Sequence, residues 1–529
     1  MLHNTSSGHD SEVCDVNDEP SGATSDGKAF YITTPLYYVN DKPHIGHAYT
    51  SIASDAIARF KALDGYDVKF LTGTDEHGQK VEKAAAKNGV TPQQFTDEVS
   101  QAFRDLKQQF NLSFDDFIRT TEARHKQAVQ AIWQKIQAQG DIYLGEYSGW
   151  YAVRDEAFYQ ESELVDGKAS TGAEVEWVTE QTYFFKLSAW GEKLLEYYDQ
   201  NPDFIAPKSR RNEVISFVEG GLKDLSISRS SFKWGIEVPD NPEHVMYVWF
   251  DALTNYISAL GYPDTDGIDF YKYWPNSLHI VGKDILRFHA VYWPAFLMAA
   301  GLKPPQRVFA HGWWTNEGEK ISKSLGNAID PVELAETYGR DQVRYFLLRE
   351  VPFGNDGDFS RTALVGRMNS DLANAYGNLV QRVMSFIFKN CDAKIPEPID
   401  FQDVDAELMS LPQHKFADIR QDMEAQSLNK YLEKVWQIIA AANRYVDAQE
   451  PWSLKKSDPV RMQTILYSLA ETIRQIAILT QPIMPDASAK ILEQLSIPEN
   501  QRCFANLSDK LRPATEITKP AGVFPRWSE

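Results

Sequence analysis

The sequence predicts an α/β protein with a parallel-sheet domain, an inserted subdomain and an α-helical C-terminal domain. Three observations predict this class. Between residues 30 and 71, a β-prone run, a helical segment and a second β-prone run follow one another with short connections. This order is typical of a parallel βαβ unit in a doubly wound sheet. A stretch rich in aromatic and turn residues then interrupts the pattern, and beyond about residue 361 the periodicity is helical throughout.

The composition excludes several classes of protein. Apolar residues make up 43% of the chain and aromatic residues 12%, too much for a wholly disordered protein. No apolar run reaches the roughly 20 residues that a membrane-spanning helix needs, so we expect no membrane association. Cys14, Cys391 and Cys503 lie far apart, which excludes a disulfide framework and favours a reducing cytoplasm. The net charge of −20 weighs against a nucleic-acid partner, although a local basic face could still bind one.

Shifts in composition divide the chain into five parts. Residues 1–28 are rich in Ser, Asp, Gly and Asn and lack the apolar core of a secretion signal, so we expect a disordered tail. Residues 29–142 and 240–360 are the two halves of the sheet domain, with strands at 30–34, 68–71, 278–281 and 307–310. The inserted subdomain spans 143–239. The helical domain spans 361–529, with helices near 362–389, 415–447, 458–480 and 485–495.

The first candidate site follows the first strand. The run Pro43-His44-Ile45-Gly46-His47 lies where this strand gives way to a helix. Backbone N–H groups and the dipole at a helix N-terminus attract phosphate. His44 and His47 can donate hydrogen bonds to phosphate oxygens as charge builds up on them, and Gly46 lets a nucleotide approach the backbone. Taken alone, the same residues also fit a turn with two surface histidines.

A second candidate site lies far downstream, between a strand and a helix. The run Glu319-Lys320-Ile321-Ser322-Lys323-Ser324-Leu325-Gly326-Asn327 offers two lysines among small, flexible neighbours. Such a loop can close over a triphosphate and neutralise charge in a transition state. Taken alone, it also fits an exposed basic loop.

In this order and on these elements, the two runs resemble the HIGH and KMSKS signatures of class I aminoacyl-tRNA synthetases. The segments 34–40 (TPLYYVN) and 72–78 (TGTDEHG) are similar to those of methionyl-tRNA synthetases. The resemblance implies a Rossmann-like catalytic domain that activates L-methionine with ATP and Mg²⁺, and then transfers it to initiator and elongator tRNA(Met). It implies catalytic roles for His44, His47, Lys320 and Lys323. The implied ATP-binding residues are His44, Gly46, His47, Gly282, Asp284 and Lys323.

The resemblance also implies a methionine site. In it, Leu36 and Tyr38 line the pocket and Asp75 binds the α-ammonium group. A carboxylate at the carboxyl end of a central strand faces the ligand crevice, which agrees with this role, although Asp75 could instead cap the next helix. Two sets of mainly aromatic residues recur at helical spacing, so each set lies on one helix face. They would form a polarizable pocket for a thioether, and the alternative is that they belong to the hydrophobic core. Their implied site residues are Trp249, Ala252, Tyr256, Ile285, His289 and Trp293. Leu253 stands where many relatives have proline and is left out of the site.

Three residues of the helical domain form a candidate site for single-stranded RNA. Asn378 and Arg382 lie one turn apart on one helix face, and Trp452 follows the end of another helix. Unstacked bases are bound by stacking on aromatic rings and by Arg or Asn at their edges. The resemblance implies that these residues recognise the anticodon CAU. The alternative is an interhelix polar pair and a buried tryptophan.

Many relatives hold a structural zinc in the inserted subdomain, bound by CxxC knuckles. Here Ala152 and Asp155 stand at the spacing of two such cysteines, and residues 143–239 contain neither cysteine nor histidine. Structural zinc sites need four ligands, mostly thiolate or imidazole. We therefore expect a subdomain without structural zinc, held together by Trp150, Tyr151, Phe158, Tyr159 and Trp177.

Four other functions fit parts of this pattern. The class I enzymes for leucine, isoleucine and valine need a large editing domain, which the range 143–239 is too short to provide. The enzyme for cysteine needs a metal-binding thiolate cluster, and no cysteine lies between Cys14 and Cys391. A catalytically inactive RNA-binding relative would not need both signatures intact, and a small-metabolite nucleotidyltransferase would not need the RNA-binding residues. Because the helical bundle ends near the end of the sequence with no extra tRNA-binding or dimerising domain after it, we expect a monomer, and the scattered cysteines favour the cytoplasm.

Overall fold

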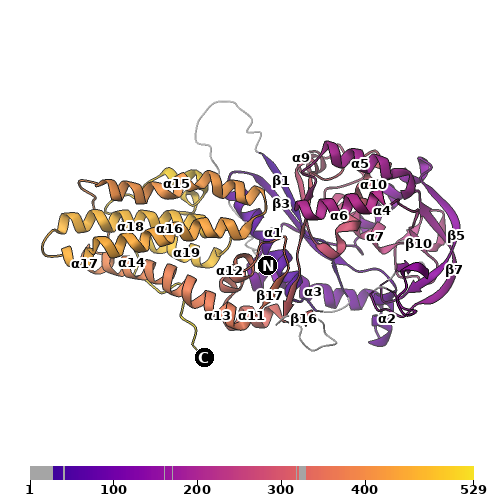
Figure 1. The fold of residues 1–529 in the computed structure, drawn as a ribbon, viewed down its shortest axis with the longest axis horizontal. Coiled ribbons are helices and arrows are strands. Elements are labelled where there is room, and N and C mark those ends of the chain that lie inside the picture. The colour runs from indigo at the N-terminus through magenta and orange to yellow at the C-terminus, as the bar shows by residue number, and fades with distance from the viewer. Residues whose placement is uncertain are drawn as a thin grey trace, which may run out of the picture.

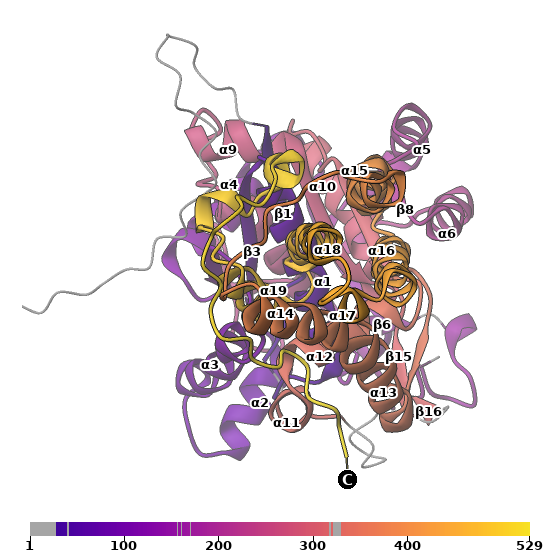
Figure 2. The ribbon, with the colours of Figure 1, turned by 90° about the vertical axis from the view of Figure 1, so that its left-hand side faces the viewer.

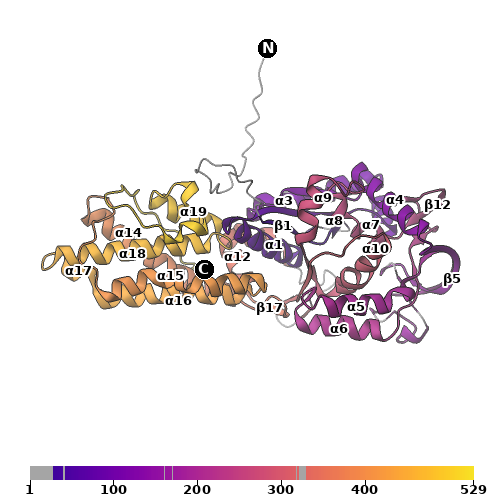
Figure 3. The same ribbon diagram turned by 90° about the horizontal axis from the view of Figure 1, so that it is seen from above.

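The molecule is elongated, with a sheet domain at one end and a helical bundle at the other (Figure 1, Figure 3). The structure, a computed structural model, describes residues 28–39, 42–155, 157–159, 161–169, 171–316, 319–320 and 329–528. Of the expected tail at 1–28, only Lys28 falls within these ranges. Every helix in the described ranges is too short or too polar to cross a membrane.

A parallel sheet of seven strands forms the centre of the larger domain. The strands pair in the order β2, β3, β1, β13, β14 and β8, with β4 also paired to β3. Their bounds are β1 Ala29–Thr33, β2 Tyr37–Tyr38, β3 Asp67–Asp75, β4 Asp116–Arg119, β8 Ile205–Ala206, β13 Ser277–Gly282 and β14 Arg307–His311. The four expected strands are confirmed, and the parallel pairing of β1 with β3 confirms the βαβ unit.

Alternation along β1 separates two hydrophobic cores. Phe30 and Ile32 belong to the core that contains α1, whereas Tyr31 belongs to the core on the other face of the sheet. This period of two follows from the pleat of a strand, and burial of both faces is usual for a parallel sheet. The helices of the first core include α1 Ile45–Leu63, α3 Pro92–Phe110, α11 Pro331–Tyr338 and α12 Arg340–Arg349. Those of the second include α4 Ala123–Ala138, α7 Val248–Leu253, α8 Asn255–Ser258, α9 Ile268–Tyr273 and α10 Trp293–Ala299.

Residues 143–239 contribute to more than one sheet. A separate antiparallel sheet lies at the end of the molecule farthest from the bundle (Figure 1), and its strands are β5 Ile142–Ala152, β6 Ala157–Tyr159, β7 Glu176–Phe185 and β9 Leu225–Ser226. Between α5 (Gly191–Gln200) and α6 (Lys208–Glu219), strand β8 pairs with β14 at the edge of the central sheet. The chain therefore returns to the central sheet well before residue 239. A strand of two residues has no periodicity that the sequence could reveal.

Two three-stranded sheets and one short helix complete the larger domain. One sheet joins the insert to α7, and its strands pair in the order β10 Ser228–Arg229, β12 Asn241–Met246 and β11 Glu237–Val238. The other flanks the expected lysine loop, and its strands are β16 Glu319–Lys320, β15 Trp314–Asn316 and β17 Gly357–Phe359. Helix α2 (Gln79–Lys87) follows β3.

The helical domain is built around α18 (Pro459–Thr480), whose side chains are almost all buried. Figure 2 shows α14, α15, α16 and α19 arranged around it. The bounds of the other helices are α13 Arg361–Arg367, α14 Asn378–Asn390, α15 Asp403–Glu424, α16 Leu428–Gln449, α17 Pro451–Leu454 and α19 Pro485–Gln494. A π-helical stretch, Met368–Gly377, joins α13 to α14. The helices expected at 458–480 and 485–495 are confirmed.

Two expectations for the bundle were wrong. The single helix expected at 415–447 is two helices, because Gln426 adopts a left-handed backbone with φ of 52° between α15 and α16. That turn contains neither glycine nor proline, so the helical pattern continued through it. Helix α15 also begins earlier than expected, at Asp403, and continues through Pro412. The second error concerns the end of the chain, where only short 3-10 turns follow α19 and the last residues cross back to pack Trp527 against Tyr338 of α11.

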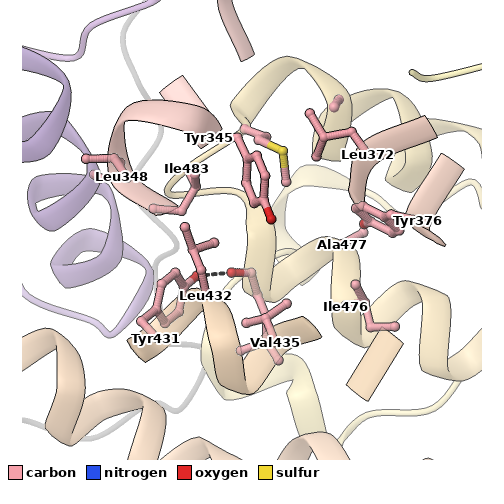
Figure 4. Close-up of a cluster of buried hydrophobic side chains, with 14 of the residues drawn as sticks. Tyr345, Leu348, Leu372, Tyr376, Tyr431, Leu432, Val435, Ile476, Ala477 and Ile483 are labelled. Carbon is pink, nitrogen blue, oxygen red and sulfur yellow. Dashed lines mark hydrogen bonds between the residues drawn. The ribbon is translucent and has the colours of Figure 1, made fainter. Parts of the chain in front are cut away.

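A buried junction joins the bundle to the sheet domain. Figure 4 shows Tyr345 of α12 among bundle side chains that include Tyr431 and Val435 of α16. Beside them the fully buried Arg344 donates to Asp55 Oδ2 of α1 at 2.6 Å and to the Ile483 carbonyl at 2.8 Å. Removing one partner of a buried ion pair is strongly destabilising, so Arg344, which contacts both Asp55 and the Ile483 carbonyl, holds α1 and the bundle together.

Candidate active site

One cavity of about 560 Å³ opens at the carboxyl ends of the central strands. Residues that end or follow four of these strands line it: Leu36, Asp75, Gly282, Asp284 and His311. Ligands bind at this edge in doubly wound sheets. The cavity is also lined by Tyr38, His44, Gly46, His47, Trp249, Ala252, Tyr256, Ile285 and His289. Thirteen of the expected methionine and ATP residues thus share one space, although they come from segments far apart in the sequence.

The two histidines of the first signature cap helix α1. His44 is the N-cap, and its Nδ1 accepts from the Gly46 N–H at 3.0 Å. The His47 Nδ1 accepts from the His44 N–H at 3.1 Å, and the two rings stack with centroids 3.7 Å apart. Because both Nδ1 atoms accept, Nε2 of each ring is the nitrogen that can donate to a ligand.

The side chain of His44 leaves no room for any residue larger than glycine at position 46. A Cβ at this position would lie 2.9 Å from His44 Cε1, closer than side chains tolerate. The sequence predicts that this glycine lets a nucleotide approach the backbone closely. The structure gives a second reason, which is room for the capping ring of His44.

Helices α7 and α8 and the π-helical turn Phe288–Tyr292 supply an aromatic side of the cavity. Trp249 stacks on Phe288 with ring centroids 3.8 Å apart and planes 5° apart. The Tyr256 hydroxyl and His289 Nε2 are 2.7 Å apart, and His289 Nδ1 lies 2.9 Å from the Ile285 carbonyl. The carbonyl can only accept, so Nδ1 carries the proton and Nε2 accepts from Tyr256.

Burial keeps His289 uncharged. Desolvation lowers the pKa of His289 to about 4, although the Ile285 carbonyl and Asp284 act in the opposite direction. At neutral pH the cavity wall therefore presents a neutral imidazole and a phenol, which suits an apolar, polarizable ligand group. π-Helical turns such as the one that carries His289 are frequent at functional sites.

Two residues differ from the expected methionine site. Trp293 does not line the cavity; it is fully buried behind the wall, with its ring centroid 6.2 Å from that of Tyr256. Leu253, which was left out of the site, does line the cavity. Trp293 begins α10, directly after the π-helical turn Phe288–Tyr292, and the side chain of Leu253 lines the cavity although many relatives have proline at this position.

The opposite side of the cavity carries Trp313 and His311, two residues that the sequence patterns did not identify. The Trp313 indole N–H donates to Asp284 Oδ1 at 3.0 Å, and His311 Nε2 lies 2.8 Å from Thr50 Oγ1 of α1. Both residues follow or end β14, as Gly282 and Asp284 do for β13. A polar or aromatic residue directly after each expected strand was therefore the signal that could have found them.

Two turns of the inserted subdomain reach the same cavity. In one, the Asp155 N–H donates to the Ala152 carbonyl at 3.1 Å, and in the other the Gly172 N–H donates to the Ala169 carbonyl at 2.7 Å. Asp155 accepts from Thr171 Oγ1 across the turns, and both residues line the cavity. Ala152, Ala169 and Ala173 form a small buried cluster. Within the described ranges, no group of three or more His, Cys, Asp or Glu side chains could hold a metal.

The lysine loop is described only in part. The backbone of Lys320 ends β16, but its side chain and the whole of Lys323 lie outside the described residues. The chain is described again from Ile329, and Asp330 caps α11 by accepting from the Val332 N–H at 2.8 Å. The loop is thus anchored between a strand and a helix, as the sequence predicted.

The three expected RNA-binding residues lie at the far tip of the bundle. Figure 1 places α17, which carries Trp452, at the opposite end of the molecule from β5 and β7. The Arg382 guanidinium lies 5.1 Å from the Trp452 ring centroid and 3.1 Å from Asp447 Oδ1. Trp452 is 42% exposed and Asn378 is exposed one helical turn before Arg382. The tryptophan is therefore not buried, and its ring can stack on a base.

Comparisons with known proteins agree over nearly the whole chain. Residues 30–171 and 159–384 match the family described as tRNA synthetases class I (M), and residues 395–529 match the anticodon binding domain of methionyl tRNA ligase. The methionine–tRNA ligase of Rickettsia felis is 58% identical over 506 residues, which cover 94% of this chain and 98% of that one. The corresponding enzyme of Mycobacterium bovis is 55% identical over 509 residues, with the same coverage.

Solved structures give the same result. Methionyl-tRNA synthetase of Mycobacterium tuberculosis in complex with methionyl-adenylate superposes with a TM-score of 0.92 at 55% identity, covering 94% of this chain and all of that one. The apo form of the M. tuberculosis enzyme superposes with a TM-score of 0.87 at 50% identity, covering 96% of this chain.

Proposed function

The chain belongs to the class I methionyl-tRNA synthetases, and from that premise we propose how its residues carry out the reaction. It activates L-methionine with ATP to methionyl-adenylate and pyrophosphate, and then charges tRNA with methionine. One observation carries the assignment of roles: a single cavity joins an aromatic side, next to Asp75, to a side that contains the α1 N-terminus and Asp284. A reaction between a carboxylate and an α-phosphate needs these two binding sites to be contiguous.

The aromatic side fits methionine. In our proposal, Asp75 binds the α-ammonium group, since a carboxylate at a strand end is its natural partner. The thioether lies among Leu36, Tyr38, Trp249, Ala252, Tyr256, Ile285 and His289, and Leu253 is added to this set. Trp293, which the sequence assigns to the same site, packs behind Tyr256 and supports its ring.

The other side fits ATP, which enters with Mg²⁺ on its phosphates. The ribose is bound by Gly282 and Asp284, and Trp313 orients the Asp284 carboxylate through its indole N–H. His44 and His47 donate from Nε2 to the phosphates, at a helix N-terminus that already attracts negative charge. Lys320 and Lys323 then neutralise the charge that develops on the pyrophosphate.

Pyrophosphate exchange tests this assignment. The purified protein should catalyse ATP–pyrophosphate exchange with methionine and not with the other nineteen natural amino acids. Faster exchange with a different amino acid, or none with methionine, would contradict the proposal.

We further propose that Asn378, Arg382 and Trp452 bind the anticodon of initiator and elongator tRNA(Met). Trp452 presents an exposed ring backed by the Arg382 guanidinium, an arrangement that favours base stacking. Helix α17 lies at the opposite end of the molecule from α7, which lines the cavity (Figure 1), so anticodon binding and activation use separate residues. We also propose that the chain acts as a cytoplasmic monomer with the domain boundaries expected from the sequence, except that β8 belongs to the catalytic sheet.

Trp452→Ala should separate the two reactions. Stacking on a base is worth roughly 1–3 kcal/mol, so we expect kcat/KM for aminoacylation to fall by about 5- to 150-fold with both tRNAs. Pyrophosphate exchange should stay at the parental rate, because the cavity is untouched. An equal loss in both reactions would mean that Trp452 is structural.

We propose that the inserted subdomain folds without zinc. The space between its two turns is filled by Ala152, Ala169 and Ala173, and Asp155 bonds to Thr171 where a knuckle would place metal ligands. Elemental analysis of the dialysed protein should find much less than one zinc per chain, and chelation should leave exchange activity unchanged. Stoichiometric zinc whose removal abolishes activity would refute this.

A further inference from the structure

A carboxylate is buried behind the methionine side of the cavity, between two histidines. Asp251 Oδ2 lies 2.6 Å from His77 Nδ1, and Asp251 Oδ1 lies 2.7 Å from His125 Nε2. On its far side, His125 Nδ1 lies 2.9 Å from Ser258 Oγ. All four side chains are almost fully buried, and none of them lines the cavity. The roles proposed above leave this network unused.

The network connects the elements that carry the methionine-binding residues. His77 follows Asp75 by two positions at the end of β3. Asp251 lies between Trp249 and Ala252 on α7. Ser258 follows Tyr256 by two positions on α8, and His125 extends the link from α4.

The short helices need an anchor of this kind. Helix α7 has six residues and α8 has four, and helices this short are not stable through their own hydrogen bonds. Packing of apolar side chains is not directional and would permit small shifts along the sheet. Charge-assisted hydrogen bonds have stricter geometry, so a buried carboxylate with a partner on each oxygen fixes both position and orientation.

The strand side of the network is equally constrained. Glu76, between Asp75 and His77, forms a bidentate pair with Arg119, with Nε to Oε1 at 2.6 Å and Nη2 to Oε2 at 3.0 Å. The Trp234 indole N–H donates to the Glu76 carbonyl at 2.6 Å. Burial alone would raise the pKa of Asp251, but His77 and His125 more than offset this and lower it to about 2. The carboxylate therefore stays ionised and keeps accepting from both rings.

We propose that Asp251, with His77 and His125, is a positioning residue that fixes the distance between the ammonium-binding Asp75 and the side-chain pocket on α7 and α8. Through that distance it determines which length of unbranched side chain the enzyme activates. The inference rests on the proposed roles of Asp75 and the aromatic pocket. It deepens them, because it names a determinant of chain-length specificity outside the cavity.

Asp251→Asn tests the proposal, since it keeps the shape and removes the charge. Pyrophosphate exchange is measured with methionine, with ethionine, which is one methylene longer, and with norvaline, which is shorter. One methylene is worth about 10- to 200-fold in discrimination, and we expect the variant to lose about tenfold of the preference for methionine over ethionine. The KM for methionine should rise more than kcat falls, and the KM for ATP should not change.

A purely structural role predicts a different result. If kcat fell equally for all three amino acids and their kcat/KM ratios stayed parental, the proposal would be overturned. Should Asp251→Asn fail to fold, Ser258→Ala removes the outermost link while leaving the carboxylate paired. In Ser258→Ala, the ratio of kcat/KM for ethionine to that for methionine should rise by about threefold, less than in Asp251→Asn, because a neutral hydrogen bond is weaker than a charge-assisted one. An unchanged ratio would reject the proposal.

A matched control comes from the bundle. Glu471 is a buried carboxylate of α18 that pairs with Arg474 at 2.7 Å, remote from the cavity. Glu471→Gln should lower Tm and leave the ethionine-to-methionine ratio at the parental value. Absence of methionine-dependent exchange in the parent would refute the proposed function itself, whereas parental selectivity in Asp251→Asn would refute only this inference.

Discussion

Asp75→Ala is expected to abolish methionine activation. The carboxylate ends β3 and lines the cavity beside Tyr38, Trp249 and Tyr256. Loss of one partner of a buried charge pair costs about 3–5 kcal/mol, which lowers kcat/KM for methionine by roughly two to four orders of magnitude. Steady-state pyrophosphate exchange measures this loss.

Three further variants separate the effect of charge from that of shape, and methionine binding from ATP binding. Asp75→Asn keeps the size of the side chain. If the charge binds the ammonium group, kcat/KM for methionine should fall nearly as far in this variant as in Asp75→Ala. Trp249→Ala removes packing only, and it should chiefly raise the KM for methionine. Asp284→Asn should raise the KM for ATP and leave methionine affinity unchanged. Parental kinetics in Asp75→Ala would exclude Asp75 from the site.

Lys323→Ala is expected to lower the rate of activation while methionine affinity barely changes. The lysine belongs to a loop anchored between β16 and α11, within the second signature. A donor that stabilises developing charge contributes mainly in the transition state, and its removal costs about 10²- to 10³-fold in kcat. Single-turnover formation of methionyl-adenylate measures the effect without interference from product release.

The control is a loop lysine elsewhere. Lys168 pairs with Glu174 at an exposed turn of the inserted subdomain, so Lys168→Ala removes the same charge without touching the second signature. It should activate methionine at the parental rate. Equal single-turnover rates for Lys323→Ala and the parent would contradict the assigned role.

Much of the site could be read from local patterns. Strand ends in a parallel sheet lie at one edge whatever the rest of the fold, so Asp75, Gly282 and Asp284 could be placed at the ligand side from their positions alone. Likewise a helix N-terminus binds phosphate through its own backbone, which identified His44 and His47. Resemblance to a family then supplied the ligands. Trp313 and His311 obey the same strand-end rule and could have been found with it.

Helical spacing was a weaker guide. It grouped Trp249, Ala252 and Tyr256 on one face of a single helix, whereas the chain forms two short helices, α7 and α8, with a break at Thr254. It also merged α15 with α16, since Gln426 makes a left-handed turn without glycine or proline. A residue of any type can be forced into such a conformation by its surroundings, and no local pattern records that.

By itself, the sequence determined the βαβ unit, the two signatures and the types of residue that line the pocket. Strand pleat, helix period and position at a strand end are all properties of short segments, which a sequence records directly. Only the tertiary structure decided which distant segments meet. Asp251 and His77 are 174 positions apart, and Arg344 and Asp55 are 289 apart, yet each pair is buried and hydrogen-bonded. A charged residue in a sequence looks the same whether it faces water or a partner. Burial makes the difference, and burial depends on how all the elements pack.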